Sequence, residues 1–412
     1  MHFNGIDQYH GYEKRLATEH NNPIDYPPEM LWGDKPEVPF FAGVRPAEYE
    51  DNYPFNYSIR VKHDDWVLGK NIEYLKSGQW EKRPFMLTAS FLSPHPSVKR
   101  RQEYLEIFRE YMNMNLEVEE LTEEHFDHLH SHTKRMIAKG KEKAFAQSKE
   151  EKRRYLAEYY SRITYFDRQV GKLIETLDVE GLRNNTVIVL TSDHGDEAGR
   201  LGYWGKVSFY DNVIKVPLII SLPPVMRKAE LTGRVRDENV SLLDLFPTFA
   251  EFAQAEALEF KIDGHSLVPL LNEKHPHWHN TVLSEYFGQY ARTPMFMLKK
   301  NDFKFNYYLG ETPELFDLAN DPGEKENLAG KPEHSALLDE LEKELRTICI
   351  PEDLHEEYVQ NNRQRALIAM ATKASIQTKQ RIKKYIRDYR ASWNEPTWDG
   401  NKEQSRYESH LE

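Results

Sequence analysis

Two segments of the chain consist of consecutive β-branched and apolar residues. They are Thr186 to Thr191 (TVIVLT) and Val216 to Ser221 (VPLIIS). Parallel strands covered by helices on both sides have this continuous apolar character, because neither face meets water. The pattern therefore predicts two central strands of a parallel sheet.

A third apolar run, Phe85 to Leu92 (FMLTASFL), also favours a buried strand. It ends at Ser93-Pro94-His95-Pro96, where two prolines force a turn. Ahead of it, residues 1–80 are rich in Asn, Tyr, Asp and Pro and show little periodicity. We interpret them as irregular loops around a site, and we expect a further segment to precede them.

Apolar residues recur at helical spacing between Glu103 and Gly181. The clearest stripe consists of Tyr155, Tyr159, Ile163, Phe166, Val170, Leu173 and Leu177. Within this region the charged stretch 118–153 contains alternating histidines, at His125, His128, His130 and His132. Alternating histidines can bind metal, but the charged neighbours favour a solvated helical face.

Helix, buried strand and polar loop follow one another as in an open α/β sheet, whose ligands bind beyond the carboxyl ends of the strands. After residue 271 shorter alternating segments, Thr281 to Tyr286 and Phe303 to Tyr308, predict a small antiparallel sheet. A charged helical region follows. We therefore expect three parts, with residues 1–271, 272–332 and 333–412.

Composition restricts the partners and the compartment. With 412 residues and 39% hydrophobic content, the chain can bury one large core and a smaller satellite. A net charge of −12 leaves no basic face for a nucleic acid. The single cysteine, Cys349, rules out an intrachain disulfide and indicates a reducing, cytoplasmic setting. The sequence shows no apolar run that predicts a signal peptide or a membrane span.

Candidate chemistry follows the first predicted strand. Asp193 and His194 are adjacent at its carboxyl end, where a carboxylate and an imidazole suit a divalent cation; a capping Asp and a packed His are the alternative. Lys206 lies in a Gly-rich loop, where its ammonium could face a dianionic ester or simply be solvated. His95, on its stiff loop, could donate a proton to a leaving oxygen.

Taken together, these segments resemble the sulfatase family of the alkaline-phosphatase superfamily. The strongest stretch is TVIVLTSDHGDEAGRLGYWGKVSFYDNVIKVPLIIS, which is similar to the family's strand, metal loop, active-site lysine and following strand. MHFNGIDQYHGYEKRLAT, SEYFGQYARTPMFMLKKNDFKF and LFDLANDPGEKENLA look like choline-sulfatase segments. The resemblance implies an α/β sandwich with a mainly parallel mixed sheet, incomplete at its N-terminal strand, plus a small C-terminal α+β subdomain.

The resemblance also implies a mechanism. A divalent metal, calcium most of all with magnesium or manganese as alternatives, orients a sulfate ester, and a formylglycine hydrate attacks the sulfur. By matched position Asp193 and His194 would be metal ligands, Lys206 would contact the sulfate and His95 would assist the leaving group. His2 falls on the second half of the family's Gly-Lys-x-His motif, and this match alone makes it a candidate catalytic residue.

The chain departs from the family in its catalytic parts. The Asp-Asp pair and the Cys-x-Pro-x-Arg or Ser-x-x-x-Arg nucleophile segment expected ahead of His2 are not in the sequence, and Cys349 is interpreted as a buried structural thiol. A truncated sulfatase, inactive without that segment, is therefore the first hypothesis. A dead or split subunit is the second, and a phosphate- or phosphonate-ester hydrolase is the third.

Two further predictions concern the substrate and assembly. Pro94-His95-Pro96 lacks the Pro-His-Asp-Pro-Tyr pattern of choline sulfatases, so the ester itself stays open. Glu285 and Tyr286 could bind a cationic head of a small sulfate ester by charge and ring attraction. The C-terminal tail, through Trp393 and Trp398, could form a homo-oligomer contact.

Overall fold

The computed structural model describes residues 12–13, 59–95, 102–114, 116–138, 148–200, 204–228, 232–256, 260–272, 278–287, 291 and 293–371. By their contacts these residues fall into two compact units. The first unit draws on residues 1–118, 147–188 and 220–226, and the second on residues 119–146, 189–219 and 227–412.

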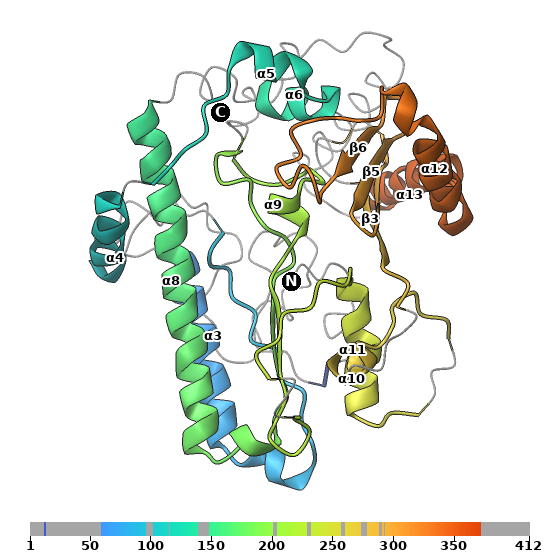
Figure 1. The fold of residues 1–412 in the computed structure, drawn as a ribbon. Coiled ribbons are helices and arrows are strands. Elements are labelled where there is room, and N and C mark those ends of the chain that lie inside the picture. The colour runs from blue at the N-terminus through green and yellow to red at the C-terminus, as the bar shows by residue number, and fades with distance from the viewer. Residues whose placement is uncertain are drawn as a thin grey trace. The chain divides into compact units, whose positions relative to one another are not determined.

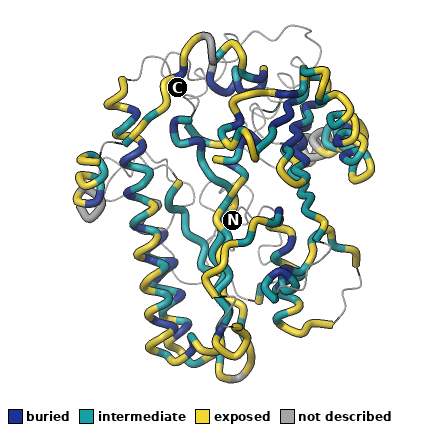
Figure 2. The backbone as a smooth tube through the Cα atoms, viewed as in Figure 1, coloured by how far each residue is buried: buried dark blue, intermediate teal, exposed yellow. Residues whose placement is uncertain are grey.

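The first unit is built around α8 (Lys149–Val179), a helix that begins with a capping box formed by Ser148 and Glu151. α3 (Ile59–Lys76) and α4 (Gln102–Asn113) pack along it (Figure 1). Buried and exposed positions alternate along α8 in Figure 2, as expected for an amphipathic helix. α4 and α8 confirm the helical spacing predicted between Glu103 and Gly181. α3 lies within residues 1–80, which were predicted to be irregular loops, so that prediction is wrong for this segment, which packs on α8.

The run Phe85 to Leu92 was predicted to be a strand, and this is wrong. It has no regular structure and follows the 3-10 helix η2 (Gln79–Lys82). Its Met86 and Leu87 side chains are exposed. The run pairs with no strand in the described part of the chain; instead the buried Asp64 carboxylate accepts the backbone N–H of Leu92 at 2.7 Å. An apolar run forms a strand only where another strand pairs with it, and the composition of the run does not show whether one does.

The two segments first singled out in the sequence do form strands. They are β1 (Ile188–Thr191) and β2 (Leu218–Ser221), which pair with each other. Their residues are mostly half-buried, and Ile219 is exposed. Burial on both faces, as the sequence predicted, is therefore not found for these two strands.

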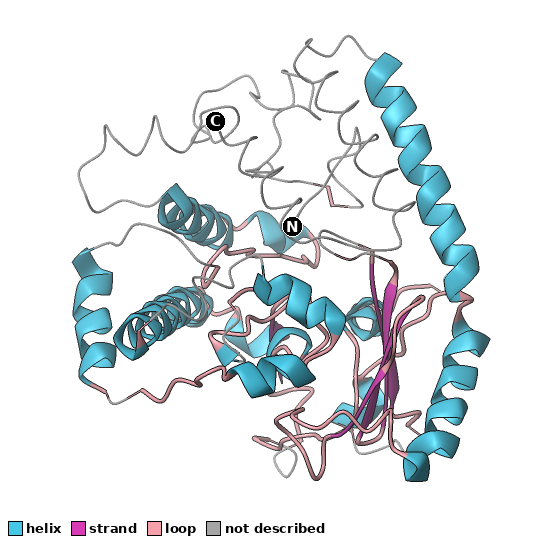
Figure 3. Ribbon diagram, turned by 90° about the horizontal axis from the view of Figure 1, so that it is seen from above, coloured by secondary structure: helices cyan, strands magenta, loops and turns pink. Residues whose placement is uncertain are grey.

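The second unit holds a four-stranded antiparallel sheet, in the order β3-β4-β5-β6. The strands are β3 (Thr281–Tyr286), β4 (Met295–Lys300), β5 (Phe303–Tyr308) and β6 (Glu314–Asp317). β3 and β5 match the bounds expected from the sequence, whereas β4 and β6 were not predicted. Figure 3 shows the strands in magenta.

The two faces of this sheet differ in composition. Side chains alternate between the faces along each strand. One face carries Phe296, Leu298 and Phe305, which pack against Leu341 and Leu345 of α12 (Ser335–Ile348), and all five are fully buried. The other face carries buried polar residues, among them Lys304, Asn306, Tyr308 and Glu314.

Short helices complete the second unit. They are α5 (Glu123–His128), α6 (Ser131–Ala138), α9 (Asp211–Ile214), η6 (Leu242–Asp244), α10 (Leu245–Phe252), α11 (Val268–Leu271) and η7 (Pro332–His334). α13 (Pro351–Ala371) follows α12, and η3 (Arg183–Asn185) belongs to the first unit. Within the described ranges, no helix is long and apolar enough to cross a membrane.

Candidate functional site

The loop after β1 presents Asp193 and His194 to solvent in a turn fixed by its own polar groups. The Asp193 carboxylate accepts the backbone N–H of His194 at 2.9 Å, and the Ser192 hydroxyl donates to the His194 carbonyl at 2.8 Å. The Asp193 side chain is 82% exposed and that of His194 is 31% exposed. Both groups are thus open to a ligand.

His194 and Lys206 are in direct contact. Nδ1 of His194 donates to the Gly195 carbonyl at 2.8 Å, so its Nε2 is the acceptor in the neutral ring. Lys206 Nζ lies 2.5 Å from that Nε2, and an Asp193 carboxylate oxygen lies 3.7 Å from it. The three residues predicted from this stretch therefore meet around one imidazole nitrogen.

Gly195 is required where the loop passes α9. A Cβ atom at this position would lie 2.0 Å from the Asn212 carbonyl oxygen. The Gly195 N–H also donates to the Val213 carbonyl at 2.6 Å. Only glycine allows this approach, which fixes the residue after His194 against α9.

Asp196 closes the loop that returns the chain to Lys206. Its carboxylate accepts the N–H groups of Ala198 at 2.8 Å and Gly205 at 3.1 Å. The Glu197 N–H donates to the Gly205 carbonyl at 2.9 Å. Because the two ends of the loop are joined here, Lys206 lies next to His194 although twelve positions separate them.

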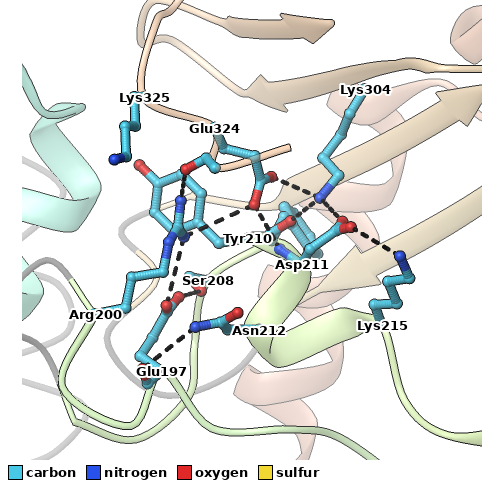
Figure 4. A network of polar contacts seen from close by, with 12 residues as sticks. Glu197, Arg200, Ser208, Tyr210, Asp211, Asn212, Lys215, Lys304, Glu324 and Lys325 are labelled. Carbon is cyan, nitrogen blue, oxygen red and sulfur yellow. Dashed lines mark hydrogen bonds and ion pairs between the residues drawn. The ribbon is translucent and has the colours of Figure 1, made fainter. Parts of the chain in front are cut away.

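Below the loop lies a network of buried charged groups, shown in Figure 4. The Ser208 hydroxyl donates to Glu197 at 2.7 Å, and Arg200 lies 3.6 Å from Glu197 and 3.8 Å from Glu324. The guanidinium of Arg200 also stacks over the Tyr210 ring, 5.1 Å from its centroid. The loop is thereby tied to residues more than a hundred positions downstream.

Lys304, fully buried on β5, is the cation at the centre of this network. Its ammonium donates to Glu324 at 2.6 Å, to the Phe209 carbonyl at 3.1 Å and to Asp211. Burial raises the pKa of Asp211, but the charge and hydrogen bond of Lys304, together with the charges of Lys299 and Lys215, outweigh it, and the pKa is lowered. For Glu324 burial prevails over Lys304, and its pKa is raised.

The pKa of Glu197 is strongly shifted by its place in this network. Burial raises its pKa to about 7, against the lowering by the Ser208 hydrogen bond and by Arg200, while Glu324 and Asp196 add to the rise. Its side chain is fully buried. Glu197 therefore exchanges a proton near neutral pH, where ordinary glutamates are ionised.

The Asp193 and His194 pair fits part of the ligand shell of a divalent cation. A carboxylate and an imidazole are suitable donors, and their donor atoms are 3.7 Å apart. Within the described residues, no third His, Cys, Asp or Glu converges with them, whereas calcium takes about six to eight oxygen ligands. The lone pair of His194 Nε2 faces Lys206, so an ion and the ammonium would compete for it.

The other predicted site residues lie elsewhere in the chain. His95 belongs to the first unit, where its N–H donates to the Leu92 carbonyl at 2.9 Å, and His2 lies outside the described residues. Glu285 and Tyr286 are neighbours in β3 and therefore point to opposite faces of the sheet. Tyr286 packs beside Phe209 in an apolar cluster, and burial raises the pKa of Glu285.

The prediction of a solvated histidine face is wrong for two of its members. His130 is 7% exposed and His132 is 1% exposed. His130 donates to the Thr312 carbonyl at 2.8 Å and stacks on Tyr308. Charged neighbours in sequence did not reveal this, because α6 and the residue before it pack on other parts of the second unit through these rings.

Sequence reasoning also missed Glu197, Arg200, Lys304 and His132 as parts of the site's support. Glu197 and Arg200 lie in the SDHGDEAGR stretch that was singled out. Two charged residues so close to Asp193 and His194 could have indicated a role in supporting the site. Lys304 and His132 carried no comparable signal, because their partners are distant in sequence.

Comparison with known proteins places these residues in a family. The family model "Sulfatase" matches residues 37–255, and the model "N-sulphoglucosamine sulphohydrolase, C-terminal" matches residues 199–350. The chain is 30% identical to the choline-sulfatase of Rhizobium meliloti over 350 residues, covering 81% of this chain and 64% of that protein. It is 29% identical to the arylsulfatase of Clostridium perfringens over 294 residues, covering 70% and 58%. The chain thus spans less than two thirds of either relative.

Solved structures share the fold. The phosphonate monoester hydrolase of Agrobacterium radiobacter aligns with a TM-score of 0.61 at 21% identity, over 76% of this chain and 74% of that one. A 2-O GAG sulfatase aligns with a TM-score of 0.57 at 24% identity, over 75% and 66%. These likenesses confirm the predicted sulfatase-like α/β fold.

Proposed function

The chain belongs to the sulfatase family, and on that premise we propose that it serves in the metal-assisted hydrolysis of a sulfate ester. The observation that carries the proposal is the meeting of Asp193, His194 and Lys206 at the end of β1. In one exposed turn, a carboxylate and an imidazole could hold a metal ion, and the sulfate group could then contact both that ion and the ammonium. Hydrolysis is the chemistry that such a site serves in this family.

Each residue has a proposed role. Asp193 and His194 would hold a divalent ion, calcium first with magnesium or manganese as alternatives, and the bound ion would polarise the ester as a Lewis acid. Lys206 would neutralise a sulfate oxygen as a point charge. His95 would protonate the leaving oxygen and His2 would assist it.

The nucleophile is not Cys349. Its thiol packs against the apolar face of the sheet, and burial raises its pKa to about 11. A thiol with so high a pKa supplies little thiolate at neutral pH. We therefore do not assign the formylglycine expected in the family to Cys349.

A choline-like ester is the proposed substrate, since the choline-sulfatase of Rhizobium meliloti is among the relatives. The carboxylate of Glu285 is exposed and acidic, and it would attract a cationic head. Glu285 pairs with Phe296 on the α12 face of the sheet, whereas Tyr286 lies on the other face beside Phe209, so the two would contact such a head from opposite faces of the strand. A cytoplasmic location and an oligomer contact through Trp393 and Trp398, outside the described residues, complete the proposal.

A subunit that binds an oxyanion without turning it over is the second candidate. It is favoured by the two-donor metal pair, because two protein ligands rarely satisfy a hard cation. Phosphate and phosphonate esters are the competing substrates, since a metal and a lysine do not by themselves distinguish sulfur from phosphorus.

The test is hydrolysis of nitrophenyl sulfate, nitrophenyl phosphate and nitrophenyl phenylphosphonate at equal concentrations. The protein is first stripped with a chelator and then supplied with calcium, magnesium or manganese. By itself the chain is expected to be inactive, because the family's nucleophile segment is not in its sequence. With that segment supplied from a sulfatase relative, we expect release of nitrophenol from the sulfate only with metal. Oxyanion binding without release from any ester would favour the second candidate, and faster release from a phosphorus ester would replace sulfate as the substrate.

A further inference from the structure

Immediately after Lys206 the chain is held in place by side chains from other parts of the second unit. The Ser208 hydroxyl bonds to Glu197, the Phe209 carbonyl accepts from Lys304, and the Tyr210 hydroxyl donates to Glu314 at 3.1 Å. All of these contacts are buried. Lys206 itself remains exposed at the start of this fixed segment.

Val207, the residue next to Lys206, has an unusual backbone conformation. Its φ is +84°, in the left-handed region that β-branched residues rarely adopt. Such a conformation persists only when the surroundings impose it. The contacts of Val207 therefore decide how the Lys206 side chain leaves the backbone.

The group that bonds to Val207 comes from α6. His132 Nε2 lies 2.8 Å from the Val207 carbonyl, and because a carbonyl only accepts, Nε2 carries the proton. Its ring is 1% exposed. Burial lowers the pKa of His132 to about 4, partly opposed by this hydrogen bond, so the ring stays neutral and the donor is fixed at neutral pH.

The other ring nitrogen of His132 supports a specific role for the donor. Nδ1 is buried, and no group of the described residues bonds to it. A buried acceptor without a partner is unfavourable. The hydrogen bond that the ring makes to the backbone beside Lys206 is a reason for an imidazole at this position despite that cost.

We propose that His132 is a positioning residue for Lys206, acting through the Val207 carbonyl to hold the ammonium against His194. The inference rests on the proposed function for its consequence in catalysis, since Lys206 is the residue assigned to the sulfate. It does not rest on it for the positioning itself, which is a property of the loop.

Two substitutions of His132, by side chains of similar length, distinguish the effect of its hydrogen bond from the effect of its packing. His132→Gln keeps an N–H near the position of Nε2, whereas His132→Met fills similar space without a donor. Glu311→Gln is the matched control, because it weakens the buried pair that docks α6, with Arg135 2.7 Å from Glu311, and leaves the Val207 bond in place. Thermal unfolding of all three reports the loss of stability.

The readout is the rate at which an amine-reactive reagent labels Lys206, followed by mass spectrometry and referred to Lys300. We expect His132→Met to label Lys206 about fivefold faster, as release of one hydrogen bond allows, and His132→Gln and Glu311→Gln to label it at the unaltered rate. With the family's nucleophile segment supplied, the kcat/KM for a sulfate ester should fall roughly tenfold in His132→Met alone.

The outcomes decide both claims separately. Unchanged labelling in His132→Met, or equally faster labelling in Met, Gln and the Glu311→Gln control, overturns the positioning role. Absence of ester hydrolysis by the protein supplied with the nucleophile segment refutes the proposed function and leaves the labelling result to decide the role of His132.

Discussion

The two faces of the four-stranded sheet are formed by the same strands but differ in their polar content. On the α12 face, Phe296, Leu298 and Phe305 are fully buried among apolar side chains. The opposite face, called the polar face below, also buries apolar residues, Met295 and Met297, but beside them Lys304 and Asn306 are buried and make hydrogen bonds to charged partners. Both faces are buried, and a buried charge is found on only one of them among these residues.

The difference indicates a division of labour. Apolar burial stabilises by removing surface from water and is not directional. Buried ion pairs gain little net stability, because desolvation offsets their attraction, but removing one partner is strongly unfavourable. The polar face is therefore suited to fixing the loop that carries His194 and Lys206, and the apolar face to holding the unit together.

Removal of the central cation should break the polar face. Lys304→Met leaves Asp211 and Glu324 without their partner, and we expect a loss of about 3–5 kcal/mol of unfolding free energy. Urea denaturation followed by fluorescence measures it. The affinity for inorganic sulfate should fall as well, measured at a temperature where the variant is folded. An unchanged affinity would show that the network does not support the loop with His194 and Lys206.

Removal of an apolar side chain should weaken stability alone. Leu341→Ala creates a cavity between α12 and the sheet, and we expect a loss of about 2–5 kcal/mol with unchanged affinity for inorganic sulfate in the folded variant. The same urea titration and a calorimetric sulfate titration test this. A weakened sulfate site in Leu341→Ala would contradict the division between the faces.

The pH dependence of stability should reveal Glu197. Its pKa rises from the ordinary 4.5 to about 7 on folding, so the folded chain binds the extra proton. The contribution is fully present below pH 4.5 and is lost as the pH rises through about 7, by about 3 kcal/mol. Glu197→Gln should flatten this slope between pH 5 and 8, and parallel curves for both proteins would argue against it.

The smallest effect is expected at the exposed end of the same sheet. Lys300 lies 2.7 Å from Glu344 on α12, with a third of its side chain exposed. A pair of this kind contributes about 0.2–1 kcal/mol. Lys300→Ala should shift the urea midpoint only slightly, in contrast to Lys304→Met. A loss as large as that of Lys304→Met would show that burial is not what separates the two lysines.

The parts of the fold that could be predicted are those with local signatures. Apolar runs predicted β1 and β2, alternating segments predicted β3 and β5, and the resemblance to the sulfatase family brought Asp193, His194 and Lys206 into one site. The run Phe85 to Leu92 misled because strand content does not ensure a strand partner.

The support of the site could not be predicted because its contacts are long-range. Lys304 follows a polar and apolar alternation that is typical of a solvated face, yet it is fully buried by partners from the site loop. His132 bonds to a residue 75 positions away. The sequence pattern indicates local periodicity, whereas these long-range contacts depend on how the helices and strands pack.

The central claim is that the turn of Asp193, His194 and Lys206 binds a sulfate group. It is tested most directly by calorimetric titration of inorganic sulfate, in calcium-containing buffer, into the unaltered protein and into Lys206→Met. We predict measurable binding that weakens at least about tenfold in the variant, as expected when one charge-assisted contact is lost, without a change in melting temperature. Equal affinity in both proteins, or no binding in either, would contradict the account.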